Sequence, residues 1–78
     1  MIADGDLDWV FIDANHNYDY VRADIAAWTP KVRPGGIIAG HDYLDRDGWG
    51  VIRAVDEAFG ERVCRARHSV WWVEADHA

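Results

Sequence analysis

The chain has 78 residues, of which 50% are hydrophobic, and its 14 acidic and 8 basic side chains give a formal net charge of −6. This length allows one domain, residues 1–78, and the hydrophobic fraction excludes a disordered chain. The acidic charge argues against nucleic acid as a partner, and no apolar run approaches the roughly 20 residues of a membrane span. The single Cys64 excludes an intrachain disulfide. With no signal peptide in view, we expect a cytoplasmic protein.

The first half of the chain predicts a strand followed by a helix. Residues 7–12, LDWVFI, form an apolar run typical of a buried strand in a parallel sheet. Either Asn15 or Asn17 can then cap a helix, because each side chain offers an oxygen to free backbone N–H groups. That helix carries one apolar stripe at helical spacing, formed by Val21, Ile25, Trp28 and Val32. Pro30 is expected to kink or tighten its last turn.

The second half repeats this order. Residues 34–36, Pro-Gly-Gly, predict a chain break, and residues 36–40, GIIAG, predict a second buried strand. A polar loop over residues 43–50 leads to a second helix, and Gly60 occupies its C-cap position. The apolar face of this helix is formed by Val51, Ile52, Val55, Ala58 and Phe59.

Residues 63–66 and 70–73 complete the chain as two short strands that predict an antiparallel hairpin. The order strand, helix, strand, helix, strand, strand predicts an α/β fold with a mostly parallel sheet and a C-terminal antiparallel hairpin. In such sheets ligands bind at the carboxyl ends of the strands. Polar side chains follow both predicted parallel strands at that edge: Asp13, His16, His41 and Asp42.

Two carboxylates and two imidazoles at one edge predict a divalent metal site, with zinc or manganese preferred and magnesium allowed. A bound metal lowers the pKa of its water, and nearby helix N-termini favour an anionic group. From the residues alone we therefore expect a metal-dependent hydrolase acting on phosphoesters. Its catalytic residues and metal ligands would be Asp13, His16, His41 and Asp42. In the alternative interpretation, Asp13 caps the first helix and Asp42 closes its loop without a metal.

Three aromatic residues lie close behind this edge in the sequence, namely Tyr18, Tyr43 and Trp49. Each is a candidate for contact with a small-molecule substrate, and Trp49 could stack on a planar ring. Packing in the core or on the surface is the alternative role for all three.

Three segments also resemble a known family: DWVFIDANHNY, DIAAWTPKVRPGGIIAGHDY and GVIRAVDEAFG. They are similar to the C-terminal half of class I S-adenosylmethionine-dependent methyltransferases, in the branch with a D-x-x-H-x-Y turn and a GG-x4-HDY turn. The resemblance runs from about Leu7 to Glu74 and implies a truncated Rossmann-like fold. Acidic residues at these strand ends hold a divalent metal in related O-methyltransferases. The resemblance therefore implies a metal site on Asp13, His41 and Asp42, with His16 close by.

The chain departs from this family pattern at its start. The family holds its cofactor with a glycine-rich turn after the first strand and an acidic residue after the second. The resemblance begins at the fourth strand, so we assign no cofactor-binding residue and expect the isolated chain not to bind S-adenosylmethionine. Two alternatives to the hydrolase follow: a partner-dependent fragment or subunit of an O-methyltransferase, and an inactive interaction module or truncation product. The bare edge of the first strand predicts a homodimer.

Overall fold

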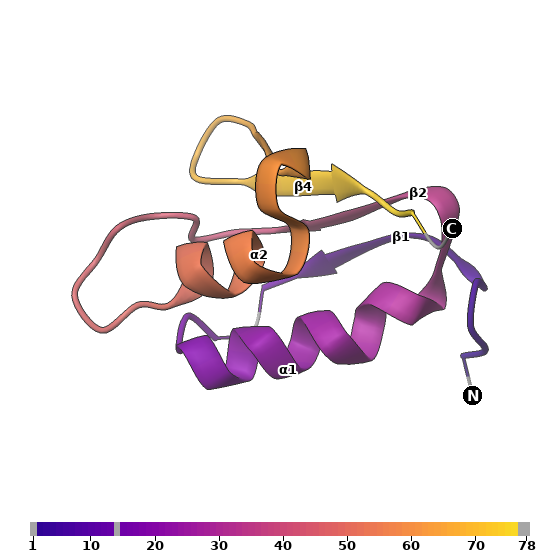
Figure 1. Ribbon diagram of the computed structural model, residues 1–78, viewed down its shortest axis with the longest axis horizontal. Coiled ribbons are helices and arrows are strands. Elements are labelled where there is room, and N and C mark those ends of the chain that lie inside the picture. Colours follow the sequence, from indigo (N-terminus) through magenta and orange to yellow (C-terminus); the bar gives the residue numbers. More distant parts are fainter. Residues whose placement is uncertain (1, 14, 77–78) are drawn as a thin grey trace.

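The chain folds as two strand–helix units followed by a hairpin (Figure 1). The computed structural model describes residues 2–13 and 15–76. Its strands and α-helices, in chain order, are β1 (Leu7–Ile12), α1 (Tyr18–Trp28), β2 (Val32–Gly40), α2 (Val51–Phe59), β3 (Cys64–Arg65) and β4 (Trp71–Glu74). A short 3-10 helix follows each α-helix, at Thr29–Lys31 and at Gly60–Arg62. The predicted order of elements is confirmed.

The described strands form one 4-stranded sheet in the order β1-β2-β4-β3. The pair β1–β2 is parallel, whereas β2–β4 and β3–β4 are antiparallel. The prediction of a mostly parallel sheet is therefore wrong, and the sheet is mixed. The reason is a tight turn in which His68 and Ser69 both have φ near +60°. Such a turn matches the twist of a hairpin, and it returns β4 into the position between β2 and β3.

Helix α1 begins and ends close to the predicted signals. Asn17 is the N-cap, and its side chain accepts a hydrogen bond from the backbone N–H of Asp19. Pro30 lies in the 3-10 turn that ends the helical segment. Val32 was predicted as the last member of the helical stripe, but it is the first residue of β2 and is fully buried. Pro30 explains the difference, because it has no N–H to donate to the preceding helical turn, and the α-helix gives way to a 3-10 turn there.

The predicted chain break at Pro34-Gly35-Gly36 is instead an irregularity within β2. Leu7 of β1 pairs with Val32, but Trp9 pairs with Ile37, so β2 uses extra residues over the same length. Gly35 has φ +84°, a conformation that glycine adopts without a steric penalty. The strand is therefore longer than predicted and bulges near its start.

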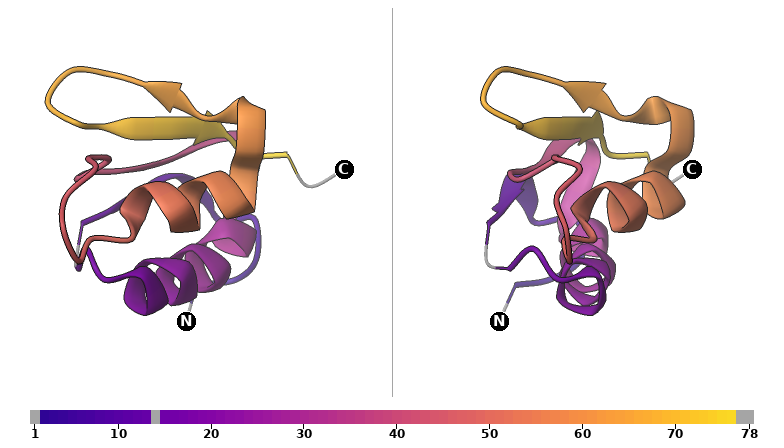
Figure 2. Two further views of the ribbon diagram at one scale, coloured as in Figure 1. Left: turned by 60° about the vertical axis from the view of Figure 1, so that its left-hand side comes forward. Right: turned by 90° about the vertical axis from the view of Figure 1, so that its left-hand side faces the viewer.

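Both α-helices cover the same face of the sheet (Figure 2), and the core lies between the helices and that face. The largest fully buried side chains are Trp71, Ile38, Val32, Val51, Val55 and Val73. Side chains of β1 that alternate away from the helices are exposed, Trp9 by 65% and Phe11 by 43%. The predicted homodimer, which would use this edge and face, stays a prediction. Across residues 2–13 and 15–76, neither helix has the length and apolar character that crossing a bilayer requires.

Candidate metal centre

The parallel pair β1–β2 brings two polar turns to the same edge of the sheet. Ile12 and Gly40 are register partners at the carboxyl ends of these strands. Asp13 and His41 are the next residues along each strand and therefore leave the sheet at the same level. Asp42 then has φ 63°, a left-handed conformation that aspartate tolerates better than most residues. This conformation turns the chain away from the sheet directly after His41.

Asp13, His41 and Asp42 form a cluster whose potential ligand atoms all lie within 4.8 Å of one another. His41 Nδ1 and Asp42 Oδ1 are 2.9 Å apart. This spacing is that of an ion pair when the imidazole is protonated, and it also brings two donor atoms close enough together to share one ion. The Asp13 side chain is exposed and can rotate to close the remaining spacing. The three residues therefore fit one divalent cation, and the imidazole favours manganese or zinc over magnesium.

Ser69, in the hairpin turn between β3 and β4, supports the cluster from the other side. Its hydroxyl lies 3.4 Å from His41 Nε2, and its carbonyl accepts a hydrogen bond of 2.9 Å from the backbone N–H of Tyr43. A hydrogen-bonding partner on a ligand histidine fixes the orientation of the ring. Sequence reasoning missed Ser69, because nothing in a five-residue hairpin connection indicates that it will fold back against His41.

The alternative in which Asp13 caps α1 does not hold, because Asn17 is the N-cap. Asn15 supports the same turn, since its side chain accepts a 2.7 Å hydrogen bond from the backbone N–H of Asn17. The carboxylate of Asp13 is therefore not needed to begin the helix. The part of the alternative that concerns Asp42 has support, because the backbone carbonyl of Asp42 accepts a hydrogen bond from Leu44 N at 2.7 Å.

His16, the fourth predicted ligand, is outside the three-residue cluster. Its ring stacks on Trp49, with centroids 4.1 Å apart and an angle of 15° between the planes. The two residues come from different turns, His16 from the connection after β1 and Trp49 from the loop after β2. Trp49, a candidate for substrate contact, is thus engaged with a residue of this chain.

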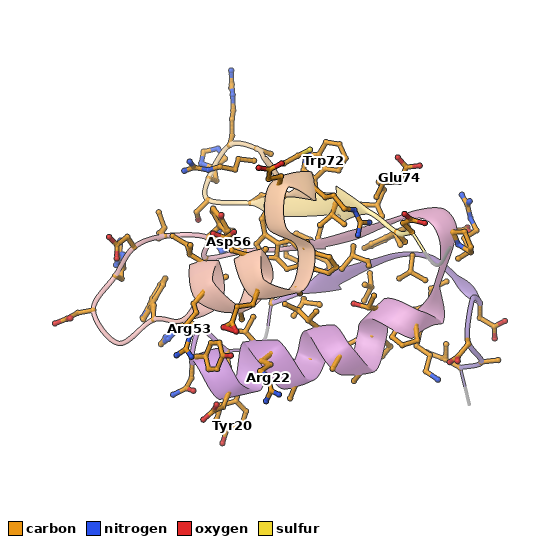
Figure 3. The ribbon with its side chains drawn as sticks, in the orientation of Figure 1. Tyr20, Arg22, Arg53, Asp56, Trp72 and Glu74 are labelled. Carbon is orange, nitrogen blue, oxygen red and sulfur yellow. The ribbon has the colours of Figure 1, made fainter. Side chains whose placement is uncertain are left out.

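The two candidate tyrosines are engaged with α2. The Tyr18 hydroxyl donates a 3.0 Å hydrogen bond to Glu57, and the Arg53 guanidinium lies over the Tyr18 ring at 3.9 Å from its centroid. Figure 3 shows Arg53 projecting from α2 toward the start of α1. The Tyr43 hydroxyl donates to the carboxylate of Asp56. Substrate contact by these tyrosines stays a prediction.

The pKa values of Tyr18 and Tyr43 are both raised, in part by their hydrogen bonds to Glu57 and Asp56. Burial raises the pKa of Tyr43, and the hydrogen bond to Asp56 and the negative charge of Asp56 raise this pKa further. The pKa of Tyr18 is also raised, chiefly by its hydrogen bond to Glu57. In both cases the neutral phenol is the form that the fold favours.

Alkaline pH should therefore destabilise the protein in part through Tyr43. Its contribution is fully present below the unfolded pKa of about 10, because both states then carry the proton. As pH rises through the higher folded pKa, the unfolded state has already lost the proton, so the free energy of unfolding falls. We expect Tyr43→Phe to show a shallower loss of stability than wild type between about pH 9.5 and 11. Urea titrations at several pH values check this, and parallel pH profiles would contradict it.

A groove between α1 and α2 lies away from Asp13, His41 and Asp42. It has a volume of about 550 Å³ and combines apolar walls with the charged Arg22 and Glu57. The cluster of Asp13, His41 and Asp42, in contrast, lies at the edge of the sheet and is open to solvent, with Asp13 exposed.

Comparison with known proteins decides the family. A family model described as a methyltransferase domain matches residues 2–43, which is more than half of the chain. The chain belongs to this methyltransferase family. The matched segment includes β1, α1, β2 and all three residues of the cluster. The resemblance seen in the sequence is thereby confirmed.

The chain is also similar to part of one much longer protein. The uncharacterized protein y4gI of Sinorhizobium fredii is 37% identical over 51 residues, which cover 64% of this chain and 6% of the relative. The chain thus spans about 6% of the length of that relative. No solved structure matches the chain.

Membership of the methyltransferase family corrects the expected activity. The metal-dependent phosphoester hydrolase predicted from the residues is wrong, because the chain belongs to a family of methyltransferases. The error has a chemical cause. Aspartate and histidine at a sheet edge bind metal ions that serve several reaction classes, so the donor set alone does not select hydrolysis.

Proposed function

We propose that this chain is the metal- and substrate-orienting part of an O-methyltransferase that depends on S-adenosylmethionine. Membership of the methyltransferase family supports the reaction class. The convergence of Asp13, His41 and Asp42 within 4.8 Å is the observation that carries the proposal. The substrate would be a small molecule with a hydroxyl group.

In this proposal the three cluster residues hold one divalent cation, zinc or manganese, and Mn²⁺ is the probe used to test it. When bound, the ion supplies Lewis acidity that lowers the pKa of a substrate hydroxyl. Asp13 contributes a carboxylate from the end of β1, and His41 with Asp42 contribute an imidazole and a carboxylate from the end of β2. Ser69 keeps the His41 ring in place from the hairpin turn. The site is open enough to admit a hydroxyl-bearing molecule, because Asp13 is exposed.

The methyl donor does not fit the residues of this chain. Residues 13–17 after β1 contain no glycine, and the two glycines of the loop after β2, Gly48 and Gly50, lie at its far end, next to α2. A cofactor of this type is cradled by a turn in which glycine lets the backbone approach closely. We therefore derive no step through the cofactor, and we expect it to be bound by polypeptide outside these 78 residues, in the same protein or in a partner.

Binding of Mn²⁺ to the purified chain tests the proposal. We expect calorimetry or electron paramagnetic resonance to show one ion per chain. Removing a hydrogen-bonding partner of a ligand typically costs 10- to 100-fold in metal affinity, so Asp42→Asn, which alters a ligand itself, should cost at least about tenfold. Titration with S-adenosylmethionine should show no binding to the chain alone.

A matched control separates ligation from general charge. Asp45→Asn removes the same charge from the same exposed loop, but Asp45 is outside the cluster. This variant should keep the wild-type affinity for Mn²⁺. Wild-type protein that binds no Mn²⁺, or equal losses in the two variants, would overturn the metal site. S-adenosylmethionine binding to the chain alone would overturn the assignment of the cofactor to other polypeptide.

A further inference from the structure

The loop between β2 and α2, residues 41–50, contacts the connection between β1 and α1 at several points. The His16 and Trp49 rings are stacked at 4.1 Å. The backbone N–H of Gly50 donates a 2.9 Å hydrogen bond to the carbonyl of His16. The Arg46 guanidinium lies 5.2 Å from the centroid of the Trp49 ring. Stacking, a backbone hydrogen bond and a cation–π contact thus meet at one point.

Gly50 shows that the two segments are in tight contact. A Cβ atom at this position would lie 2.6 Å from Tyr18 Cα and 2.8 Å from Tyr18 N, at the first turn of α1. Backbone therefore meets backbone, and only glycine fits without displacement of one segment. The loop ends here and α2 begins at the next residue, Val51.

The two segments in contact are those that carry the metal-binding cluster. Asp13 lies three residues before His16 on the first segment. His41 and Asp42 begin the loop in which Trp49 is the residue before the last. The pairing of Ile12 with Gly40 fixes where the two segments leave the sheet, and the stack of His16 on Trp49 joins them again further along the chain. An exposed carboxylate such as that of Asp13 binds an ion more tightly when its backbone is already in the binding position, because less freedom is lost on binding.

We propose that His16 and Trp49 act as positioning residues, a stacked latch that preorganises the cluster of Asp13, His41 and Asp42 for its cation. This inference rests on the proposed function, since it assigns a role in binding the same ion. In this role His16 acts through the stacking of its ring on Trp49, and not as a metal ligand through a ring nitrogen. The apparent affinity for the cation should therefore follow the fraction of molecules in which the two rings are stacked.

Mn²⁺ titrations of four variants and one control variant test this latch. Trp49→Ala and His16→Ala should each weaken Mn²⁺ binding about tenfold, and the double variant should lose no more than either single variant. His16→Phe keeps a ring for stacking but has no nitrogen ligand, and it should bind Mn²⁺ within about threefold of wild type. Tyr20→Ala removes an aromatic residue that is 62% exposed, and it serves as the control with unchanged affinity.

A second measurement follows the stack without any metal. The proton resonances of the His16 ring should be shifted upfield in wild type by the indole of Trp49, and this shift should vanish in Trp49→Ala. Far-UV circular dichroism verifies that each variant is folded. Wild-type protein without Mn²⁺ affinity overturns the proposed function and the latch together. Wild-type affinity in Trp49→Ala, or its loss in His16→Phe, overturns the latch alone, and the latter outcome makes His16 a metal ligand.

Discussion

Replacing Trp71 with alanine should cost about 3–5 kcal/mol of the free energy of unfolding. The Trp71 side chain is 1% exposed and lies in β4, where its ring is 5.9 Å from that of Phe59 on α2. Truncation would remove the largest buried side chain between the sheet and α2 and leave a cavity behind. A chain of this size has only about 4–12 kcal/mol of stability, so the variant should be substantially unfolded or close to it.

Urea titration followed by circular dichroism measures the loss, with Trp72→Ala as the matched control. Trp72 is the next residue of β4, and Figure 3 shows it at the upper part of the molecule. Its side chain alternates to the sheet face that the helices leave bare, and it is only partly buried. We expect its truncation to cost at least about 2 kcal/mol less. Equal losses in the two variants would show that the helices do not cover the face that contains Trp71.

Replacing Gly40 with alanine should damage both stability and the metal site. A Cβ atom on Gly40 would lie 2.6 Å from Trp71 Nε1 and 2.7 Å from the carbonyl oxygen of Ile12. The Ile12 carbonyl belongs to the paired strand, so relief requires separation of β1 from β2. Overpacking of this kind costs about 1–3 kcal/mol. Because Gly40 directly precedes His41, we also expect weaker Mn²⁺ binding, measured by calorimetry beside the urea titration.

Gly48→Ala is the control for the Gly40 variant. Gly48 has φ +77° but open space around the Cβ position. Its substitution should cost about 1–2 kcal/mol through backbone conformation alone, with Mn²⁺ affinity unchanged. Unaltered Mn²⁺ affinity in Gly40→Ala would mean that the spacing of β1 and β2 does not control the cluster.

Local patterns were sufficient to predict most of the elements. The apolar run LDWVFI is β1, Asn17 begins α1, and Gly60 ends α2 with φ +59°. These features depend on near neighbours, namely a side-chain cap, a missing Cβ atom or an apolar periodicity. The error at Val32 has the same origin. Its spacing fits the helical stripe, but a buried place in β2 decides its conformation.

The candidate site was predictable in part. Asp13, His41 and Asp42 were identified because carboxyl ends of neighbouring parallel strands meet, and the register of β1 with β2 confirms that they do. The stack of His16 on Trp49 and the approach of Ser69 to His41 were not predictable. Each depends on how a loop folds back, and no spacing in the sequence encodes that path.

The amino-acid sequence by itself determined the strand and helix segments, the polar residues that end β1 and β2, and the family to which the chain belongs. Only the tertiary structure decided that β4 lies antiparallel beside β2, that His16 contacts Trp49, and that both described α-helices lie on one face of the sheet. The division has a physical reason. Segment identity depends on interactions over a few residues, whereas strand order and loop contacts depend on which distant surfaces exclude water together.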